Sequence, residues 1–374
     1  MGGPLAIVGF LALILLVVIP IHELGHLLVA RRFGFKIQEY FVGFGPRLWS
    51  VRRGETEYGV KAIPAGGYVK IAGMNPYEPV APEDLPRAYG SKPIRQRALV
   101  ILAGPVSHLL VGAVLYFALF VTYGDMNTDR VIVGAVSRTL GGEPSPAIEA
   151  GLQPGDVVIR VGDLENPSPD SLTSYVTTYA EENHGEPLTY VIDRDGRRLT
   201  LAIVPQLVTE GEVTRGRIGF TLGAERLSLP EAAVVSGEWV GRATWNSVTT
   251  IPKIFTEGVG RTFSVLFSDE SRRATDPTGL VGVSRQIGDA GAQGDWGLFL
   301  AFAAYVTIFI GVVNLVPLPP LDGGHLLLLT WEKVTGRQAD YRKLVPVSAA
   351  VIIFFSIFAI AIVFLDITEP LPRI

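Results

Sequence analysis

Residues 4–30 read PLAIVGFLALILLVVIPIHELGHLLVA, an apolar run that ends in a cluster of ionisable side chains. Residues 4–21 carry no charge, and His22, Glu23 and His26 then follow within the same run. On a helix, His22 and His26 lie one turn apart on one face, a spacing at which two imidazoles bind one zinc ion with the glutamate beside it. The stretch therefore predicts a membrane-spanning helix that carries part of a zinc site.

A simpler alternative is a helix end whose polar side chains only reach the membrane interface. Ionisable groups inside a bilayer cost roughly 2.5–3.5 kcal/mol each, so three together favour a function. The chain has no cysteine, which excludes disulfides and thiolate ligands, so any metal must be held by His, Asp or Glu. The net charge of −4, without a suitable basic cluster, gives no indication of a nucleic-acid partner.

Four segments are apolar and long enough to cross about 30 Å of hydrocarbon, which predicts a polytopic α-helical membrane protein. They are residues 4–30, 98–123, 297–316 and 344–365. A dozen Lys and Arg lie in residues 31–97, and more follow the third segment, which by the positive-inside rule places both loops in the cytosol. We therefore expect both termini and residues 125–295 to be extracytoplasmic, and HELGH to lie near the cytosolic side.

The N-terminal segment lacks the basic start and the cleavage site of a signal peptide, so we expect it to be retained. The predicted divisions of the chain are a first transmembrane helix at 1–33, a membrane-associated β-element with a loop at 34–96, a second transmembrane helix at 97–123, a β-rich domain at 127–206, surface helices at 207–296, a third transmembrane segment at 297–330, a cytosolic loop at 331–343 and a fourth transmembrane helix at 344–366.

The first cytosolic loop is rich in aromatic and β-branched residues at 36–51 and 55–74, with Gly and Pro between them. This pattern predicts short strands joined by turns. The strands form either a small surface sheet or a β-element beside the metal site, where an edge strand could pair with an extended peptide. Residues 75–87, rich in Pro, Glu and Asp, predict a mobile loop.

The second apolar segment contains AGPVSH at residues 103–108. Gly104 and Ser107 are small enough to let another helix approach closely. His108 is either a buried hydrogen-bonding residue or a further metal ligand.

Residues 129–206 predict a small β-rich domain, with strands at 131–136 and 157–161, a helix at 169–182 and a hairpin turn at Asp195-Gly196. The stretch SPAIEAGLQPGD at 145–156 resembles bacterial PDZ domains, which bind peptide ends by adding a strand to an open edge. The resemblance implies a peptide groove at Val133 and Gly134, where the glycine helps to hold a terminal carboxylate. A β-domain without a ligand is the alternative.

Two further regions complete the pattern. Aromatic side chains among polar ones at residues 229–267 are typical of helices that lie on a membrane surface. Residues 311–325 read GVVNLVPLPPLDGGH, and their prolines cannot continue a regular helix. A broken helix is a common way to place liganding groups inside a membrane. The break offers Asp322 or His325 as a third ligand, with Asn314 as a further polar group.

Taken together, HELGH, GYVK in the first loop, AGPxxH, the PDZ-like stretch and NxxPxPxLDG resemble the site-2 protease family, in its bacterial form with a single PDZ domain. The resemblance implies that His22, His26 and Asp322 bind one zinc ion and that Glu23 is the catalytic acid and base. It also implies that Asn314 contacts the substrate backbone and that a membrane-associated β-element, where we expect Gly67 and Tyr68 to bind substrate, lies near the active site. The family often has Asn where this chain has His108, so no role is carried over to that position.

The function implied by the resemblance is zinc-dependent hydrolysis of peptide bonds in or near the membrane spans of single-span proteins. In this family such regulated intramembrane proteolysis acts on anti-sigma factors or signal-peptide remnants. The implied setting is the bacterial inner membrane, with single-span substrates, lipid and peptide ends at the PDZ-like domain as partners. A divalent-cation transporter and a non-catalytic peptide-binding scaffold are the alternatives. The intact Glu23 and the absence of an internal repeat favour the enzyme.

Overall fold

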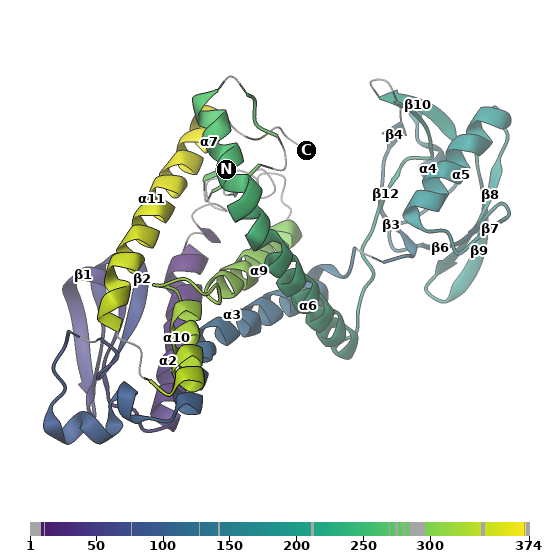
Figure 1. Cartoon of the computed structure of the whole chain (residues 1–374). Coiled ribbons are helices and arrows are strands. Elements are labelled where there is room, and N and C mark those ends of the chain that lie inside the picture. The colour runs from purple at the N-terminus through teal and green to yellow at the C-terminus, as the bar shows by residue number, and fades with distance from the viewer. Residues whose placement is uncertain are drawn as a thin grey trace. The chain divides into compact units, whose positions relative to one another are not determined.

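The computed structural model describes residues 9–10, 12–75, 77–126, 128–140, 143–210, 213–268, 270–273, 276–279, 281–283, 296–337, 341–369 and 371. Within these ranges, four helices are long and apolar enough to cross a membrane: Ile14–Arg32, Ile94–Tyr123, Trp296–Val313 and Val345–Thr368 (Figure 1). Four candidate spans therefore lie where the sequence predicted them. The start of the first predicted span, residues 4–8, lies outside the described residues. The chain divides into two compact units, one formed by Met1–Leu119 with Val234–Ile374 and the other by Phe120–Ala233.

The first unit contains the candidate spans. A π-helical segment, Ile14–Val18, continues into α2 (Ile19–Arg32), and the other long helices are α3 (Ile94–Tyr123), α9 (Trp296–Val313) and α11 (Val345–Thr368). Glycines allow these helices to pack closely: a Cβ on Gly25 of α2 would lie 2.4 Å from the Ala103 carbonyl oxygen of α3. A Cβ on Gly112 of α3 would likewise lie 2.4 Å from the side chain of Ile308 in α9. Such small residues let membrane helices approach at backbone distance.

The third predicted segment is broken, as expected from its prolines. Helix α9 ends at Val313, and a separate helix α10 (Asp322–Thr335) begins eight residues after Asn314. The Gly323 N–H donates to the Asn314 carbonyl oxygen at 2.7 Å, which closes the connecting turn. A Cβ on Gly323 would lie 2.2 Å from the Leu315 carbonyl oxygen, so this turn requires glycine there.

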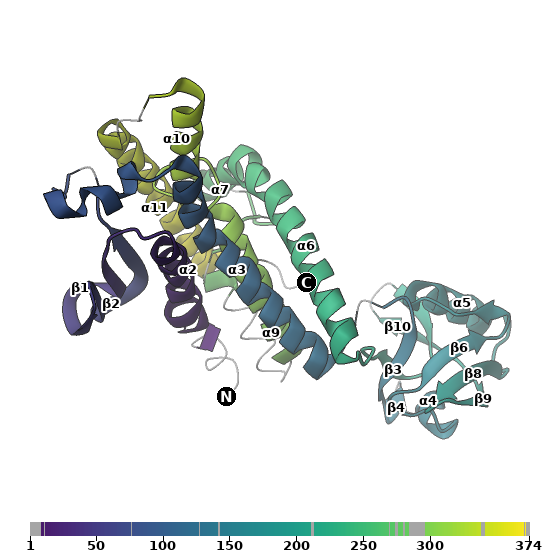
Figure 2. The same cartoon turned by 90° about the horizontal axis from the view of Figure 1, so that it is seen from below.

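The first loop forms two long bent strands, β1 (Ile37–Arg53) and β2 (Thr56–Ile71), rather than several short ones. Both views place this pair beside α2 (Figures 1 and 2), and the Tyr40 hydroxyl donates to the Pro20 carbonyl oxygen at 2.8 Å. In the register, Tyr40 is opposite both Val69 and Tyr58. Residues 39–42 of β1 therefore lie between two parts of β2. Residues 67–71 of β2 pair with β1 on one side only, so they form one edge of this sheet.

Residues 82–87, within the stretch for which the composition predicts a mobile loop, form a regular element. They form a 3-10 helix, Pro82–Arg87, in which Asp84 and Arg87 make ion pairs. Lys36 contacts Asp84 at 3.3 Å, and Arg87 Nη1 donates to Glu55 Oε2 at 2.8 Å. These contacts fasten the segment to the start of β1 and to the β1–β2 turn.

The region between the PDZ-like sequence and the third span contains α6 (Leu229–Lys253), a π-helical turn Ile254–Gly258 and α7 (Val259–Phe267). Helix α7 meets one end of α11 in Figure 1, and the Phe255 and Phe355 rings meet edge to face at 5.7 Å. Buried Asp366 of α11 accepts a hydrogen bond from Arg272 at 2.9 Å and others from the Gly279 and Gly282 N–H groups. One buried carboxylate thus holds this connection against the last span.

The second unit is a β-sheet covered by α5. Its six-stranded sheet has the order β12-β3-β6-β8-β9, with β7 paired to β6. The elements are β3 (Val131–Val136), α4 (Pro146–Glu149), β6 (Val157–Val161), β7 (Leu164–Glu165), α5 (Pro169–Glu182), β8 (Leu188–Arg194), β9 (Arg197–Ile203) and β12 (Phe220–Leu222). The pairs β4 (Thr139–Leu140) with β5 (Glu143–Pro144) and β10 (Gln206–Glu210) with β11 (Val213–Arg217) are separate.

The sequence signals in this unit explain its elements. Ser168 accepts a hydrogen bond from the Ser171 N–H and forms a capping box, which starts α5 at its predicted first residue. The core beneath α5 is apolar, with Val131, Leu172, Tyr190 and Ile203 among its buried residues. The predicted strands at 131–136 and 157–161 and the predicted helix at 169–182 are confirmed. The unit is longer than the predicted 127–206, because β12 pairs with β3 and joins the same sheet.

Candidate active site

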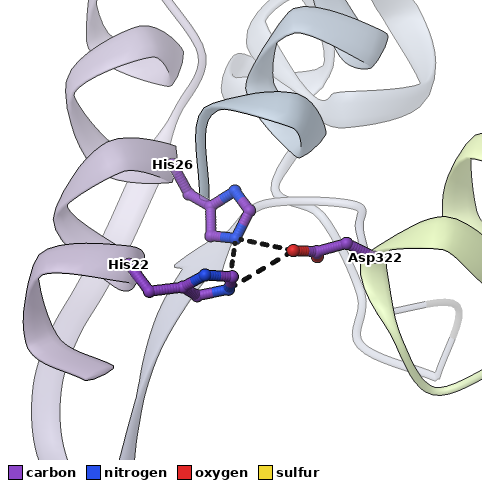
Figure 3. Close-up of side chains that lie close together, drawn as sticks. All are labelled: His22, His26 and Asp322. Carbon is purple, nitrogen blue, oxygen red and sulfur yellow. Dashed lines mark hydrogen bonds and ion pairs between the residues drawn. The ribbon is translucent and has the colours of Figure 1, made fainter. Parts of the chain in front are cut away.

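Three side chains from opposite ends of the chain converge between α2 and α10 (Figure 3). His22 and His26 project from one face of α2, and Asp322 projects from the first turn of α10. The two Nε2 atoms are 3.1 Å apart, and Asp322 Oδ2 lies 3.3 Å from that of His22 and 3.4 Å from that of His26. The predicted spacing on α2 and the predicted break before α10 thus bring these groups to one point.

The orientation of His26 is fixed by α3. Its Nδ1 is 2.8 Å from the Val100 carbonyl oxygen, which can only accept, so Nδ1 donates and Nε2 is free to bind a metal. A Cβ on Gly104 of α3 would lie 2.4 Å from His26 Nε2 and 2.6 Å from the His22 ring. The small residues of the AGPVSH stretch therefore make room for the two imidazoles.

The dimensions of this cluster suit a zinc ion. Ligand atoms at about 2.0–2.1 Å from a tetrahedral zinc lie about 3.3 Å from one another, close to the separations between these three atoms. The two imidazoles are 10% exposed and the Asp322 side chain is 14% exposed, and the Asp322 Oδ2 atom has no hydrogen-bond partner. Two imidazoles and one carboxylate are a donor set that zinc prefers.

The cluster opens into a cavity of about 230 Å³ that Glu23, Tyr68 and Asn314 also line. Val69, at the edge of β2, lines the same cavity as Glu23. A Cβ on Gly67 would lie 3.3 Å from the Glu23 side chain, so β2 passes close to this glutamate. The two halves of the predicted site, on the helices and on the β-element, therefore face one cavity.

Tyr68 is held in place by its own strand pair. Its hydroxyl donates to Glu39 at 2.5 Å, and its ring stacks on Phe41 with the Lys61 ammonium 4.8 Å from its centre. Burial, together with the Glu39 carboxylate, raises the pKa of Tyr68, so its hydroxyl keeps its proton at neutral pH.

The two remaining histidines of this region lie outside the three-residue cluster. His108 is buried, and its ring centre is 5.0 Å from that of His22. His325 lies one turn beyond Asp322 and lines two adjoining cavities instead. Within the described ranges, only His22, His26 and Asp322 form a group close enough to hold a metal ion.

Comparison with known proteins agrees with this geometry. The model of peptidase family M50 matches residues 10–359. The chain belongs to peptidase family M50. Zinc metalloprotease Rip1 of Mycobacterium tuberculosis strain H37Rv is 32% identical over an alignment of 403 residues, gaps included. The alignment covers 96% of each chain. Zinc metalloprotease Rip1 of Mycolicibacterium smegmatis is 32% identical over 406 residues, 96% of this chain and 97% of the relative.

This M50 peptidase is thus an intramembrane zinc metalloprotease, a multi-pass membrane protein with zinc as its cofactor. The predicted site-2 protease family is confirmed, and the transporter and scaffold alternatives give way to the enzyme.

The PDZ-like unit of the peptidase holds a separate cavity of about 330 Å³ between α5 and residues 215–222. Val133 and Gly134, the expected groove residues, lie within β3 beside β12 and do not line this cavity. The lining includes Ile218, Gly219 and Phe220, which precede or begin the edge strand β12. Gly219 has a φ of +93°, a conformation that favours glycine, and it lies between two apolar residues at the start of β12.

Proposed function

We propose that His22, His26 and Asp322 hold the zinc ion and that Glu23 is the acid and base that cleaves membrane-embedded peptide bonds of single-span proteins. The observation that carries this proposal is the convergence of three ligand atoms 3.1–3.4 Å apart, from two helices that are remote in sequence. Three protein ligands leave one tetrahedral position open, which is typical of a catalytic site.

Bound zinc supplies a Lewis acid that polarises the scissile carbonyl and makes a water molecule acidic near pH 7. The Glu23 carboxylate accepts the proton of that attacking water and passes it to the leaving amide nitrogen. The carbonyl of Val100 keeps His26 in the tautomer that carries its proton on Nδ1, so Nε2 presents its lone pair to the metal. Asn314 lines the same cavity and offers an amide to the substrate backbone.

The edge formed by residues 67–71 is the surface that we propose receives the substrate. These residues pair with β1 on one side, Gly67 lies close to the Glu23 side chain, and Val69 lines the same cavity as Glu23. The carbonyls of a membrane helix are bonded within the helix, so a substrate must unwind locally before attack. An unwound segment can replace its lost hydrogen bonds by adding a strand to this edge, with Gly67 leaving space and Tyr68 flanking it.

The remaining parts of the proposal concern orientation and selection. The concentration of Lys and Arg in residues 31–97 supports a cytosolic position for the first loop, with the site near that face of the bacterial inner membrane. The PDZ-like unit then lies outside the cytoplasm, where we propose that its cavity between α5 and residues 215–222 binds peptide ends of substrates.

Zinc content and cleavage, measured on the same purified preparations, test the ligand assignment. Wild-type protein is expected to hold one zinc ion per chain and to cut a single-span peptide in detergent. Asp322→Ala should lose most of its zinc and all measurable cleavage, because two imidazoles alone do not complete the site. An Asp322→Ala protein that retains one tightly held zinc ion would contradict the assignment.

A further inference from the structure

A buried ion pair joins the two helices that flank the metal centre. Arg97, in the first turn of α3, donates from Nη1 and Nη2 to the two carboxylate oxygens of Glu332 in α10, at 2.9 and 2.6 Å. Their side chains are only 5% and 12% exposed. The Arg97 guanidinium also lies over the ring of buried Tyr89, 5.7 Å from its centre. A two-pronged contact of this kind fixes orientation as well as distance.

Each of these helices holds part of the metal centre. Three residues after Arg97, the Val100 carbonyl accepts the hydrogen bond from His26. Ten residues before Glu332, Asp322 begins α10, a rise of about 15 Å along the helix. The contacts therefore form a closed path from His26 to α3, through Arg97 and Glu332 to α10, and through Asp322 back to His26.

Other contacts of α10 with this path are less directional. Leu326 packs against an apolar cluster that includes Val100 and Ile101 of α3. Apolar packing resists separation of the helices but tolerates small slides of one along the other. A buried ion pair adds little net stability, because desolvation offsets its attraction, yet it can specify one arrangement.

We propose that Arg97 and Glu332 are positioning residues, which set where Asp322 stands relative to the two histidines and thereby tune the affinity for zinc. This inference rests on the proposed ligand set. It predicts an effect on metal binding from two side chains that do not line the cavity beside the metal ligands.

The test compares two arginine variants of the full chain. Purified protein in detergent is stripped with a chelator and titrated with zinc, and the absorption spectrum of its cobalt(II) form is recorded. Arg97→Met should weaken zinc binding on the order of 10-fold and alter the cobalt bands, as is usual when support of a metal site is lost. Arg272→Met is the matched control. It removes a second buried arginine, whose carboxylate partner Asp366 lies on α11 and not on a helix of the metal centre. Its zinc affinity should remain within about twofold of wild type, whatever its melting temperature.

Arg97→Lys is a second variant in case Arg97→Met does not fold. It keeps a positive charge beside Glu332 but loses the two-pronged contact, so zinc affinity should still fall several-fold. Wild-type zinc affinity in a folded Arg97 variant overturns the inference, and so does an equal loss in Arg272→Met. An Asp322→Ala protein that binds zinc as tightly as wild type would instead refute the ligand assignment itself.

Discussion

The metal centre and the PDZ-like cavity are built in different ways. The first is assembled from α2, α3, α10 and β2, and its polar groups are held by buried directional contacts such as His26 with Val100 and Arg97 with Glu332. The second lies within one compact unit, between a helix and the edge strand of a sheet whose core is apolar. Displacement of one element should therefore disable the metal centre. A substitution in the PDZ-like cavity should lower affinity for a peptide end while the unit around it stays folded.

The largest expected effect is that of Glu23→Gln. The amide keeps the shape of the side chain but cannot accept the proton of the attacking water, so cleavage of a single-span peptide should fall about 10²- to 10⁴-fold. Zinc content should remain at the wild-type value, because Glu23 is not among the proposed ligands. Rates are measured with purified protein, and Glu257→Gln, which alters an exposed glutamate between α6 and α7, is the control.

A Glu23→Gln protein with more than a tenth of the wild-type rate would show that another group moves the proton. A protein that also loses its zinc would show that Glu23 has a structural part in the site.

A smaller but still large effect is expected from Gly104→Ala. The added methyl would lie 2.4 Å from His26 Nε2, so α3 or the imidazole must shift, and zinc affinity should fall about 10- to 100-fold. Gly241→Ala in α6 is the matched control, since a Cβ there meets nothing within 4 Å. The control should bind zinc as wild type does. Equal affinities of the two variants would contradict the close packing of α3 on the histidines.

The difference between the two regions also explains what sequence reasoning could predict. The metal centre depends on short motifs with fixed local meaning: the spacing of His22 and His26 on a helix, and the prolines that end α9 before Asp322. Sequence patterns likewise predicted β3, β6 and α5. The choice between Asp322 and His325 was different, because both follow the same break. Which of the two side chains faces the histidines depends on the residue at which α10 begins. Local sequence patterns do not predict that residue.

Contacts between remote segments were beyond sequence reasoning. Arg97 and Glu332 are 235 residues apart, and neither has a neighbour that marks it as one of a pair. The resemblance to PDZ domains implies a groove at Val133 and Gly134, and the sequence pattern predicted that the domain ends at residue 206. Strand β12 completes the sheet from further along the chain, and its pairing with β3 is a tertiary contact.

Thr173→Arg should show that the PDZ-like cavity can be weakened alone. Thr173 is exposed on α5 and lines the cavity, so a long charged side chain there should lower affinity for a peptide end about 10-fold, or about 1.4 kcal/mol. Ser174→Arg, at the next exposed position of the same helix, does not face the lining and is the control. Binding is measured by fluorescence anisotropy of labelled peptides, with zinc content recorded in parallel. Equal peptide affinities of the two variants would place the groove elsewhere.

The smallest effect is expected where an ion pair is exposed. The Arg87 guanidinium, helped by Lys36, lowers the pKa of Glu55 to about 2 from an ordinary value of 4.5. A lowered pKa means that the pair stabilises the fold fully above pH 4.5 and loses this contribution as the pH falls toward 2. The Glu55 side chain is 39% exposed, so solvent screening limits the contribution to about 0–1 kcal/mol.

Glu55→Gln should therefore lower the melting temperature slightly at pH 7, and this difference from wild type should narrow at pH 3. Glu83→Gln is the control for removing an exposed carboxylate. Glu83 lies in the 3-10 helix Pro82–Arg87, which carries Arg87. A difference that widens on acidification would mean that the carboxylate is unfavourable in the fold. Breaking a buried pair costs about 3–5 kcal/mol of folding free energy. If Glu55→Gln cost as much at pH 7, the exposed contacts of the β-element would be no weaker than the buried contacts around the metal centre.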